Sequence, residues 1–364
     1  MRAIWFAIAL LATPEWRVAV DDYPWSFPED HWAHDGYRTE WWYFTGHLHT
    51  GDVSRPRFAY QFTFFRIGIT EERPALDSAW VTSSAIMGHA AVTDLSTGRH
   101  VFSEVLHREI PLLAAFEEHP AERIGWSRAP AGTKALWWLD WSGEGFELSA
   151  ADDRQGMSFR LTTRIDDAVV FQGPLGLSRK ADSENAASQY YSFTRLPTEG
   201  TLTWDGERFD VRGTSWMDKE FSSSHLADHQ AGWDWFSLRL DDGRDLMLYL
   251  MRASDGSVDF ASGTLVDPTG SDRVVYLDED DFEVSVLGHW SSPSTGARYP
   301  SRWRIRLDSG LTLEVRAAVP DQENRSRLPG GVYYWEGAVE IDGRATGVGF
   351  VELTGYGEGN RPPV

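Results

Sequence analysis

The sequence contains no cysteine, which excludes disulfide bonds and metal sites built from thiolates. A chain without cysteine is compatible with both oxidising and reducing compartments. Basic residues are also scarce, because 34 Lys and Arg face 55 Asp and Glu and leave a formal net charge of -21. Such a charge opposes binding to phosphate backbones and to anionic lipid. We therefore expect no nucleic-acid partner.

Long apolar runs are missing too, and none of the 364 residues lies in a segment that could form a transmembrane helix. The apolar stretch from Ala3 to Ala12 follows Met1-Arg2 and resembles the core of a signal peptide. Its cleavage region is a loose match, since Val18-Ala19-Val20 only approximates a small-x-small site. We predict a weak signal peptide over residues 1–20, a periplasmic or secreted protein, and no integral membrane segment.

The motifs of two common enzyme classes are absent. A nucleophile elbow requires Gly-x-Ser-x-Gly, and Gly213-Thr214-Ser215-Trp216 lacks the second glycine. Phosphate-binding loops lead into a helix, whereas Gly330-Gly331 leads into predicted strands. Nothing in the sequence indicates a serine triad, and convincing helical periodicity is almost lacking.

Aromatic residues are abundant, with 18 Trp, 12 Tyr and 19 Phe, and many belong to a repeated pattern. The segment Glu40–Gly51 is echoed by Gly232–Gly243, and each copy is an aromatic strand that ends at a turn glycine. A second apolar run follows each copy and ends in arginine, at Arg66 and Arg252. Self-similarity at about half the chain length indicates duplication and two related β domains.

Alternation of apolar and polar residues supports this interpretation. Phe58, Tyr60, Phe62 and Phe64 share one face of a predicted strand by their period of two. Many short strands at regular spacing need closure to hide their edges. We predict an all-β protein with two consecutive antiparallel β-barrels, over residues 21–195 and 196–364, and a long functional or interdomain connection over residues 173–189.

Four ordered motifs resemble the lipocalin-like family that contains AttH proteins and carotenoid 1,2-hydratases. The motifs are Phe27–His34 running into Tyr37–Tyr43, Ser215–Phe221, Gly232–Phe236, and Tyr334–Gly337 with Gly349–Tyr356. The resemblance covers about residues 24–357 and implies two lipocalin-like β-barrels, often in an exported protein. The family includes enzymes that add water across an isoprenoid double bond, and related proteins guide polyene cyclisation. Many members have no established activity, so the family implies the fold more firmly than a reaction.

Hydration of an alkene needs a strong acid, a cavity that tolerates a cation, and a positioned water. Asp234, between two tryptophans, and Asp218, two residues after Trp216, are candidate catalytic acids. Lys219 is a third candidate, although the hydratases tend to have histidine there, so a potential proton shuttle is missing. The alternative for Asp234 is a buried ion pair with an arginine such as Arg66 or Arg252.

Aromatic and acidic residues of the same motifs are candidates for an apolar ligand site. For Glu40 a salt bridge is the alternative, and for Glu336 and Glu352 a role in holding strands or domains together. The predicted ligand-binding residues are Glu40, Trp41, Trp42, Tyr43, Trp216, Trp233, Trp235, Tyr334 and Glu336.

Metal binding is a competing possibility, because possible ligands occur at short spacing. None of these groups reproduces a recognised catalytic zinc pattern, so we predict neither a metal nor a cofactor. The groups are His31 and His34 with Glu40, His47 with His49, and His225 with Asp228 and His229.

Three functions follow from the sequence. The preferred hypothesis is an exported carrier of an apolar or isoprenoid-like small molecule, bound in an aromatic cavity near the domain interface. A second is an acid-catalysed hydratase or cyclase of a polyene, so whether the chain is an enzyme stays open. A third is a partner protein of an envelope export apparatus. A deep cavity with a buried unpaired carboxyl favours the enzyme, and a pocket without one favours the carrier.

Overall fold

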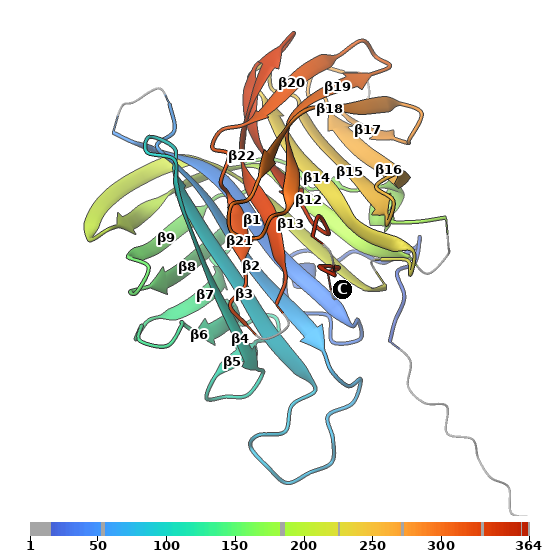
Figure 1. Ribbon diagram of the computed structural model, residues 1–364. Helices are drawn as coiled ribbons and strands as arrows, with labels where there is room; N and C mark the ends of the chain where they lie inside the picture. Colours follow the sequence, from blue (N-terminus) through green and yellow to red (C-terminus); the bar gives the residue numbers. More distant parts are fainter. Residues whose placement is uncertain are drawn as a thin grey trace, which may run out of the picture.

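The computed structural model confirms an all-β protein built from two large antiparallel sheets (Figure 1). It describes residues 16–51, 55–182, 186–224, 226–270, 273–328, 331–357 and 359–362. Most of the predicted signal peptide, residues 1–15, therefore lies outside the described residues. Within the described part, helix is limited to two single turns of 3₁₀ type, η1 (Glu29–His31) and η2 (Pro174–Gly176).

The first sheet has 13 strands in the order β4-β3-β2-β1-β13-β12-β9-β8-β7-β6-β5, with β10 and β11 also paired to β12. Its strands are β1 (Thr39–Thr50), β2 (Phe58–Gly68), β3 (Ser84–Asp94), β4 (Arg99–Arg108), β5 (Ala114–Phe116), β6 (Arg123–Arg128), β7 (Leu136–Trp141), β8 (Phe146–Asp152), β9 (Met157–Thr163), β10 (Val170–Phe171), β11 (Leu177–Arg179), β12 (Ala187–Trp204) and β13 (Glu207–Ser224).

The second sheet has 10 strands in the order β17-β16-β15-β14-β23-β22-β20-β19-β18, with β21 paired to β22. Its strands are β14 (Gln230–Leu240), β15 (Asp245–Ala253), β16 (Val258–Val266), β17 (Val274–Leu277), β18 (Phe282–Ser291), β19 (Arg298–Leu307), β20 (Thr312–Ala317), β21 (Glu323–Arg325), β22 (Tyr333–Gly343) and β23 (Gly347–Leu353).

The two sheets repeat one topology, as the sequence duplication predicts. In the first sheet β1 lies between β2 and β13, and in the second β14 lies between β15 and β23. The turn glycine of each repeat has a positive φ, +62° at Gly51 and +96° at Gly243, a conformation that residues with a Cβ rarely adopt. Each sheet curls around its own apolar core, in the manner of a lipocalin-like barrel.

The predicted domain boundary lies within the first sheet. That boundary, between residues 195 and 196, falls inside β12, and both β12 and β13 belong to the first sheet. The first sheet therefore extends to Ser224. The predicted long connection over residues 173–189 contains β11, which pairs with the start of β12. Sequence alternation locates strands, but their hydrogen-bonded partners are set by tertiary pairing.

Alternate residues of the central strands face opposite ways. In β2 the side chains of Phe58, Tyr60, Phe62 and Phe64 are fully or almost fully buried inside the first barrel, as the period of two predicted. The residues between them face outward. Truncation of such a buried aromatic residue to alanine typically costs about 3–5 kcal/mol of stability. The apolar side chains at even residue numbers in β1 and β14 likewise pack inside the first and the second barrel.

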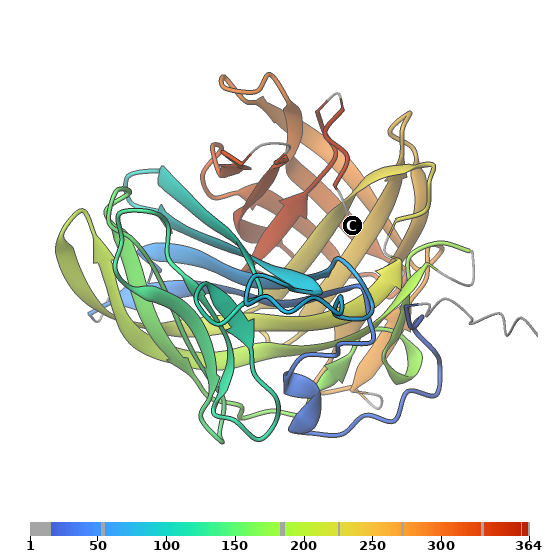
Figure 2. The same cartoon turned by 90° about the horizontal axis from the view of Figure 1, so that it is seen from below.

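The outward faces of the two barrels pack against each other (Figures 1 and 2), where β1, β12 and β13 lie beside β14 and β22. A third apolar cluster, with Tyr43 from β1 and Trp235 from β14, fills this interface. Arg195 of β12 also forms an ion pair of 2.9 Å with Asp245 of β15. The outer faces of the central strands are therefore buried, which creates an interior between the barrels as well as inside them.

Candidate functional site

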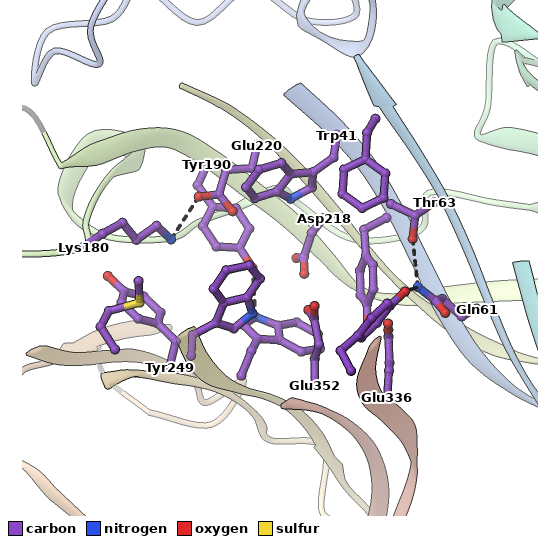
Figure 3. Close-up of a pocket in the computed structure, with 16 residues that line it drawn as sticks. Trp41, Gln61, Thr63, Lys180, Tyr190, Asp218, Glu220, Tyr249, Glu336 and Glu352 are labelled. Atoms are coloured by element: carbon purple, nitrogen blue, oxygen red, sulfur yellow. Dashed lines mark hydrogen bonds and ion pairs between the residues drawn. The ribbon is translucent and has the colours of Figure 1, made fainter. Parts of the chain in front are cut away.

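A cavity lies between the two barrels, and Figure 3 shows the side chains that line it. Its empty space, with the solvent at its mouth included, is about 750 Å³. Its walls come from both sheets and combine aromatic rings with four carboxyl groups. The lining residues are Trp41, Tyr43, Gln61, Thr63, Phe65, Lys180, Tyr190, Asp218, Glu220, Trp233, Trp235, Tyr249, Met251, Tyr334, Glu336 and Glu352.

The duplicated strands build this cavity from matching positions. In the first sheet Tyr43 of β1 lies opposite Asp218 of β13. In the second sheet Trp235 of β14, the counterpart of Tyr43, lies opposite Glu352 of β23. The rings of Tyr43 and Trp235 meet edge to face with their centres 5.2 Å apart. Each repeat thus contributes one ring and one acid to the same space.

Two acids of the second sheet form a pair. Glu336 of β22 and Glu352 of β23 are direct cross-strand partners on the face that looks into the cavity (Figure 3). Facing side chains in an antiparallel pair have their Cβ atoms only about 4.5–5.5 Å apart, so two charges there repel strongly. Burial raises the pKa of Glu352 to about 7, and burial together with the charge of Glu352 raises the pKa of Glu336 well above its usual range.

Glu336 also lacks the partners that buried carboxyl groups normally have. Among the described residues, neither of its oxygens makes a hydrogen bond of normal geometry, and its neighbouring donor is the Tyr43 hydroxyl, which acts to lower the pKa of Glu336. An ionised carboxylate in this position would be very costly. The pair Glu336 and Glu352 therefore holds at least one proton at neutral pH.

Asp218 is the third acid of the cavity. Burial raises the pKa of Asp218 to about 7, although hydrogen bonds from Ser192, Trp216 and Tyr190 act in the opposite direction. The Trp216 indole nitrogen donates to the Asp218 carboxyl at 2.8 Å, and the Ser192 hydroxyl donates to the same oxygen. These donors fix the orientation of the carboxyl, so Asp218 is held in place whether or not it is charged.

Lys180 and Glu220 form an ion pair on one side of the cavity, with 2.9 Å between the Lys180 ammonium and a Glu220 oxygen. The ammonium lies over two aromatic rings, 4.3 Å from the centre of Tyr249 and 5.0 Å from that of Tyr190. Figure 3 shows this group apart from Glu336, Gln61 and Thr63, with Asp218 and Glu352 between the two ends. The cavity therefore has a charged end and an end with a protonated acid.

A second cavity adjoins the first and shares five lining residues with it, Trp41, Phe65, Trp233, Tyr334 and Glu352. The Tyr334 hydroxyl lies 2.7 Å from Nδ1 of His89, which lines the second cavity. Burial lowers the pKa of His89 to about 3, so its ring is neutral. The shared residues make the two spaces neighbouring parts of one interior.

Asp234 lies away from this cavity. It occupies an even position of β14 and faces the interior of the second barrel, opposite to the face of Trp233 and Trp235. The Arg252 Nε donates to its carboxyl at 2.7 Å, and the Tyr356 hydroxyl donates at 2.9 Å. Asp234 therefore forms the ion pair with Arg252 that the sequence offered as the alternative, and this pair connects β14 to β15.

Lys219, Glu40 and Trp42 lie inside the first barrel. Lys219 and Glu40 form a fully buried ion pair, and the Lys219 ammonium lies 3.7 Å from the centre of the Trp42 ring. Burial alone would raise the pKa of Glu40, but Lys219 and His34 hold it at about 2. Glu40 borders the second cavity, but its carboxylate is engaged by Lys219 and by Nδ1 of His34 at 2.6 Å. These contacts fit the salt-bridge alternative for Glu40.

The predicted site residues thus divide between three places. Seven line the cavity, Trp216 donates a hydrogen bond to Asp218, and the other four face the barrel interiors. The residues that the sequence reasoning missed include Glu220, Lys180 and Tyr190. The two-residue spacing of Asp218 and Glu220 was the available signal, because it places both on one face of a strand. The cavity residues that were predicted are Trp41, Tyr43, Asp218, Trp233, Trp235, Tyr334 and Glu336.

The histidines considered as metal ligands make other contacts. Nδ1 of His31 lies 2.6 Å from the Tyr191 hydroxyl, and His34 contacts Asp30 and Glu40. His47 contacts Arg239, and His225 lies outside the described residues. Across the described residues there is no group of three or more His, Cys, Asp or Glu side chains placed to hold a metal ion.

Residues 18–356 match the AttH-like family, which is most of the chain. The protein belongs to the AttH-like family. A crystal structure of an AttH-like protein from Nitrosomonas europaea is similar over 93% of this chain and 99% of its own, with 30% identity and a TM-score of 0.80. The crystal structure of kievitone hydratase from Nectria haematococca is similar over 94% of this chain and 97% of its own, with 13% identity and a TM-score of 0.63. It shares the fold. No curated protein sequence matches the chain.

These matches confirm the predicted family and its lipocalin-like fold of two barrels. Within the described part of the chain, no helix has the length and the apolar character that are needed to cross a membrane.

Proposed function

We propose that this AttH-like protein binds an apolar, isoprenoid-like small molecule between its barrels and hydrates a double bond of it by acid catalysis. The observation that carries the proposal is Glu336, a fully buried carboxyl aimed into an aromatic cavity with the Tyr43 hydroxyl as its neighbouring donor and no cation paired to it among the described residues. Burial and the neighbouring Glu352 raise its pKa well above the usual range, so it carries a transferable proton at neutral pH.

The reaction has two steps. The proton of the Glu336 carboxyl forms a C–H bond with one alkene carbon while the π bond breaks, which leaves a cation on the more substituted carbon. A water molecule then forms the C–O bond and releases its extra proton to the carboxylate of Glu336, directly or through Glu352. Water is added, both carboxyls return to their starting state, and no oxidant, reductant or cofactor is consumed.

The walls of the cavity suit the charge that develops. The faces of aromatic rings attract cations, and Trp41, Trp233 and Trp235 line the space together with the acids. Asp218 is oriented by Trp216 and could hold the water or the developing cation. An intramolecular double bond in place of water would give cyclisation, with the same donor and the same cation.

Two further points support hydration over simple carriage. A carrier has no need of a buried protonated acid aimed into its cavity, whereas an acid catalyst depends on one. The fold is also shared by a protein named as a hydratase. Export, a periplasmic or secreted location, and a partner in an envelope or transporter complex remain predictions, because they rest on the weak signal peptide and the family resemblance alone.

The test is Glu336→Gln, which keeps the shape of the protonated side chain but removes the transferable proton. Native and variant protein are incubated with an isoprenoid extract in isotopically labelled water, and hydrated products are identified by mass spectrometry. We expect the variant to lose about 10²–10⁴-fold in turnover. Binding of the neutral apolar dye N-phenyl-1-naphthylamine should stay unchanged.

Glu207→Gln is the matched control, because Glu207 is exposed and lies outside the cavity on the same strand as Asp218. A Glu336→Gln variant that forms the hydrate at the native rate would contradict the catalytic role. Dye binding and ligand capture without any hydrate from the native protein would instead favour the carrier.

A further inference from the structure

One buried cation faces the cavity without a role in the proposed reaction. Lys180 follows directly after β11, is 7% exposed, and lines the space between the barrels. A lysine ammonium has three N–H donors and no acceptor. Within the described residues, the Lys180 ammonium contacts two oxygens, one of Glu220 at 2.9 Å and the Ser178 hydroxyl at 3.2 Å. For the third N–H donor, the part of the chain that the structure describes offers the faces of Tyr249 and Tyr190.

The two tyrosine hydroxyls next to Lys180 already have other hydrogen-bond partners. The Tyr249 hydroxyl is engaged by the Ser178 hydroxyl and the Arg179 carbonyl oxygen. The Tyr190 hydroxyl accepts a hydrogen bond from the Trp235 indole at 3.2 Å. A buried charged donor without an oxygen acceptor is costly, so an acceptor on a bound molecule would stabilise it.

Charge decides which acceptor fits. Lys180 and Glu220 already neutralise each other, and Asp218, Glu336 and Glu352 line the same space. A ligand carboxylate or phosphate would bring a negative charge close to the buried carboxylate of Glu220. A carbonyl or hydroxyl oxygen accepts a hydrogen bond without adding charge.

We infer that Lys180 anchors a neutral oxygen, a ketone or hydroxyl group, at one end of the ligand. The inference rests on the proposed function, because it places the reacting double bond at the other end, beside Glu336 (Figure 3). The substrate class is then an oxygenated apolar molecule, and a pure hydrocarbon lacks the group that Lys180 recognises. Lys180 is a specificity-determining residue in this scheme.

The experiment compares two ligands on two proteins. Geranylacetone, an acyclic isoprenoid ketone, and the hydrocarbon of the same skeleton without the oxygen each displace N-phenyl-1-naphthylamine from the native protein and from a Lys180→Met/Glu220→Gln double variant. The double change removes both charges together, so neither is left buried alone. Far-ultraviolet circular dichroism and dye affinity check that the variant keeps its fold and its cavity.

We expect the native protein to bind the ketone about tenfold more tightly than the hydrocarbon, and the double variant to bind both alike. Equal affinity of the native protein for the two ligands, or displacement by neither, would overturn the anchor. A preference for the ketone that survives in the double variant would overturn it too. The proposed catalytic role of Glu336 can be refuted independently of the anchor. This is the case if Glu336→Gln leaves hydration unchanged while the ketone preference still depends on Lys180.

Discussion

Replacing Glu352 with glutamine should make the protein more stable at alkaline pH. Glu352 lies opposite Glu336 between the two barrels, and burial raises its pKa from 4.5 to about 7. Glutamine has nearly the shape of the protonated carboxyl but no proton to lose. The variant should therefore keep the interactions that the native protein has only while Glu352 is protonated.

The sign follows from proton linkage. Because the pKa is higher in the folded state, the folded protein binds more protons than the unfolded chain between about pH 4.5 and pH 7. The stabilisation is complete below pH 4.5 and is lost as the pH rises through 7. The pKa of Glu352 rises from 4.5 to about 7, and each pKa unit corresponds to about 1.4 kcal/mol. The free energy of unfolding therefore changes by roughly 3 kcal/mol. Glu352→Gln should match the native protein near pH 4 and exceed it by up to this amount near pH 8.

The assay is urea unfolding of both proteins at intervals from pH 4 to pH 8.5, with the free energy of unfolding plotted against pH. Glu207→Gln serves as the control, since the exposed Glu207 makes no contact with the cavity. The reasoning is refuted if Glu352→Gln is no more stable than the native protein at pH 8, because the carboxylate would then be well solvated or paired.

Three further predictions concern the two barrel interiors and the acid itself. Asp234→Asn leaves the Arg252 charge inside the second barrel, and should lower the free energy of unfolding by about 3 kcal/mol while the remaining folded protein keeps its turnover. Lys219→Met should cost about 3–5 kcal/mol by leaving Glu40 without its main partner, and the double variant Glu40→Gln/Lys219→Met should regain much of that loss in urea unfolding. Initial rates of hydration should fall at alkaline pH as Glu336 loses its proton, and a rate that rises with pH instead would exclude it as the donor.

Much of the candidate site could be predicted from the family motifs, but the roles within it could not. Trp233 and Trp235 share a strand face, and the sequence predicts this from their spacing. Asp234, between them, was the expected catalytic acid, yet it faces Arg252 inside the barrel. Glu352 was interpreted as an acid that holds strands or domains together, and it faces the cavity beside Glu336.

The sequence by itself determined the fold class, the duplication and the strands that begin each barrel, because these depend on local alternation and on glycines with positive φ such as Gly51 and Gly243. Only the tertiary structure decided what each strand face covers. The alternation of side chains along a strand indicates which of them share a face. It does not indicate whether that face packs into a barrel core or against the other barrel. In this protein both sides are buried, so hydrophobicity does not distinguish them. The pairing of β22 with β23 and the packing of the two sheets place Glu336, Glu352 and Asp218 around one cavity.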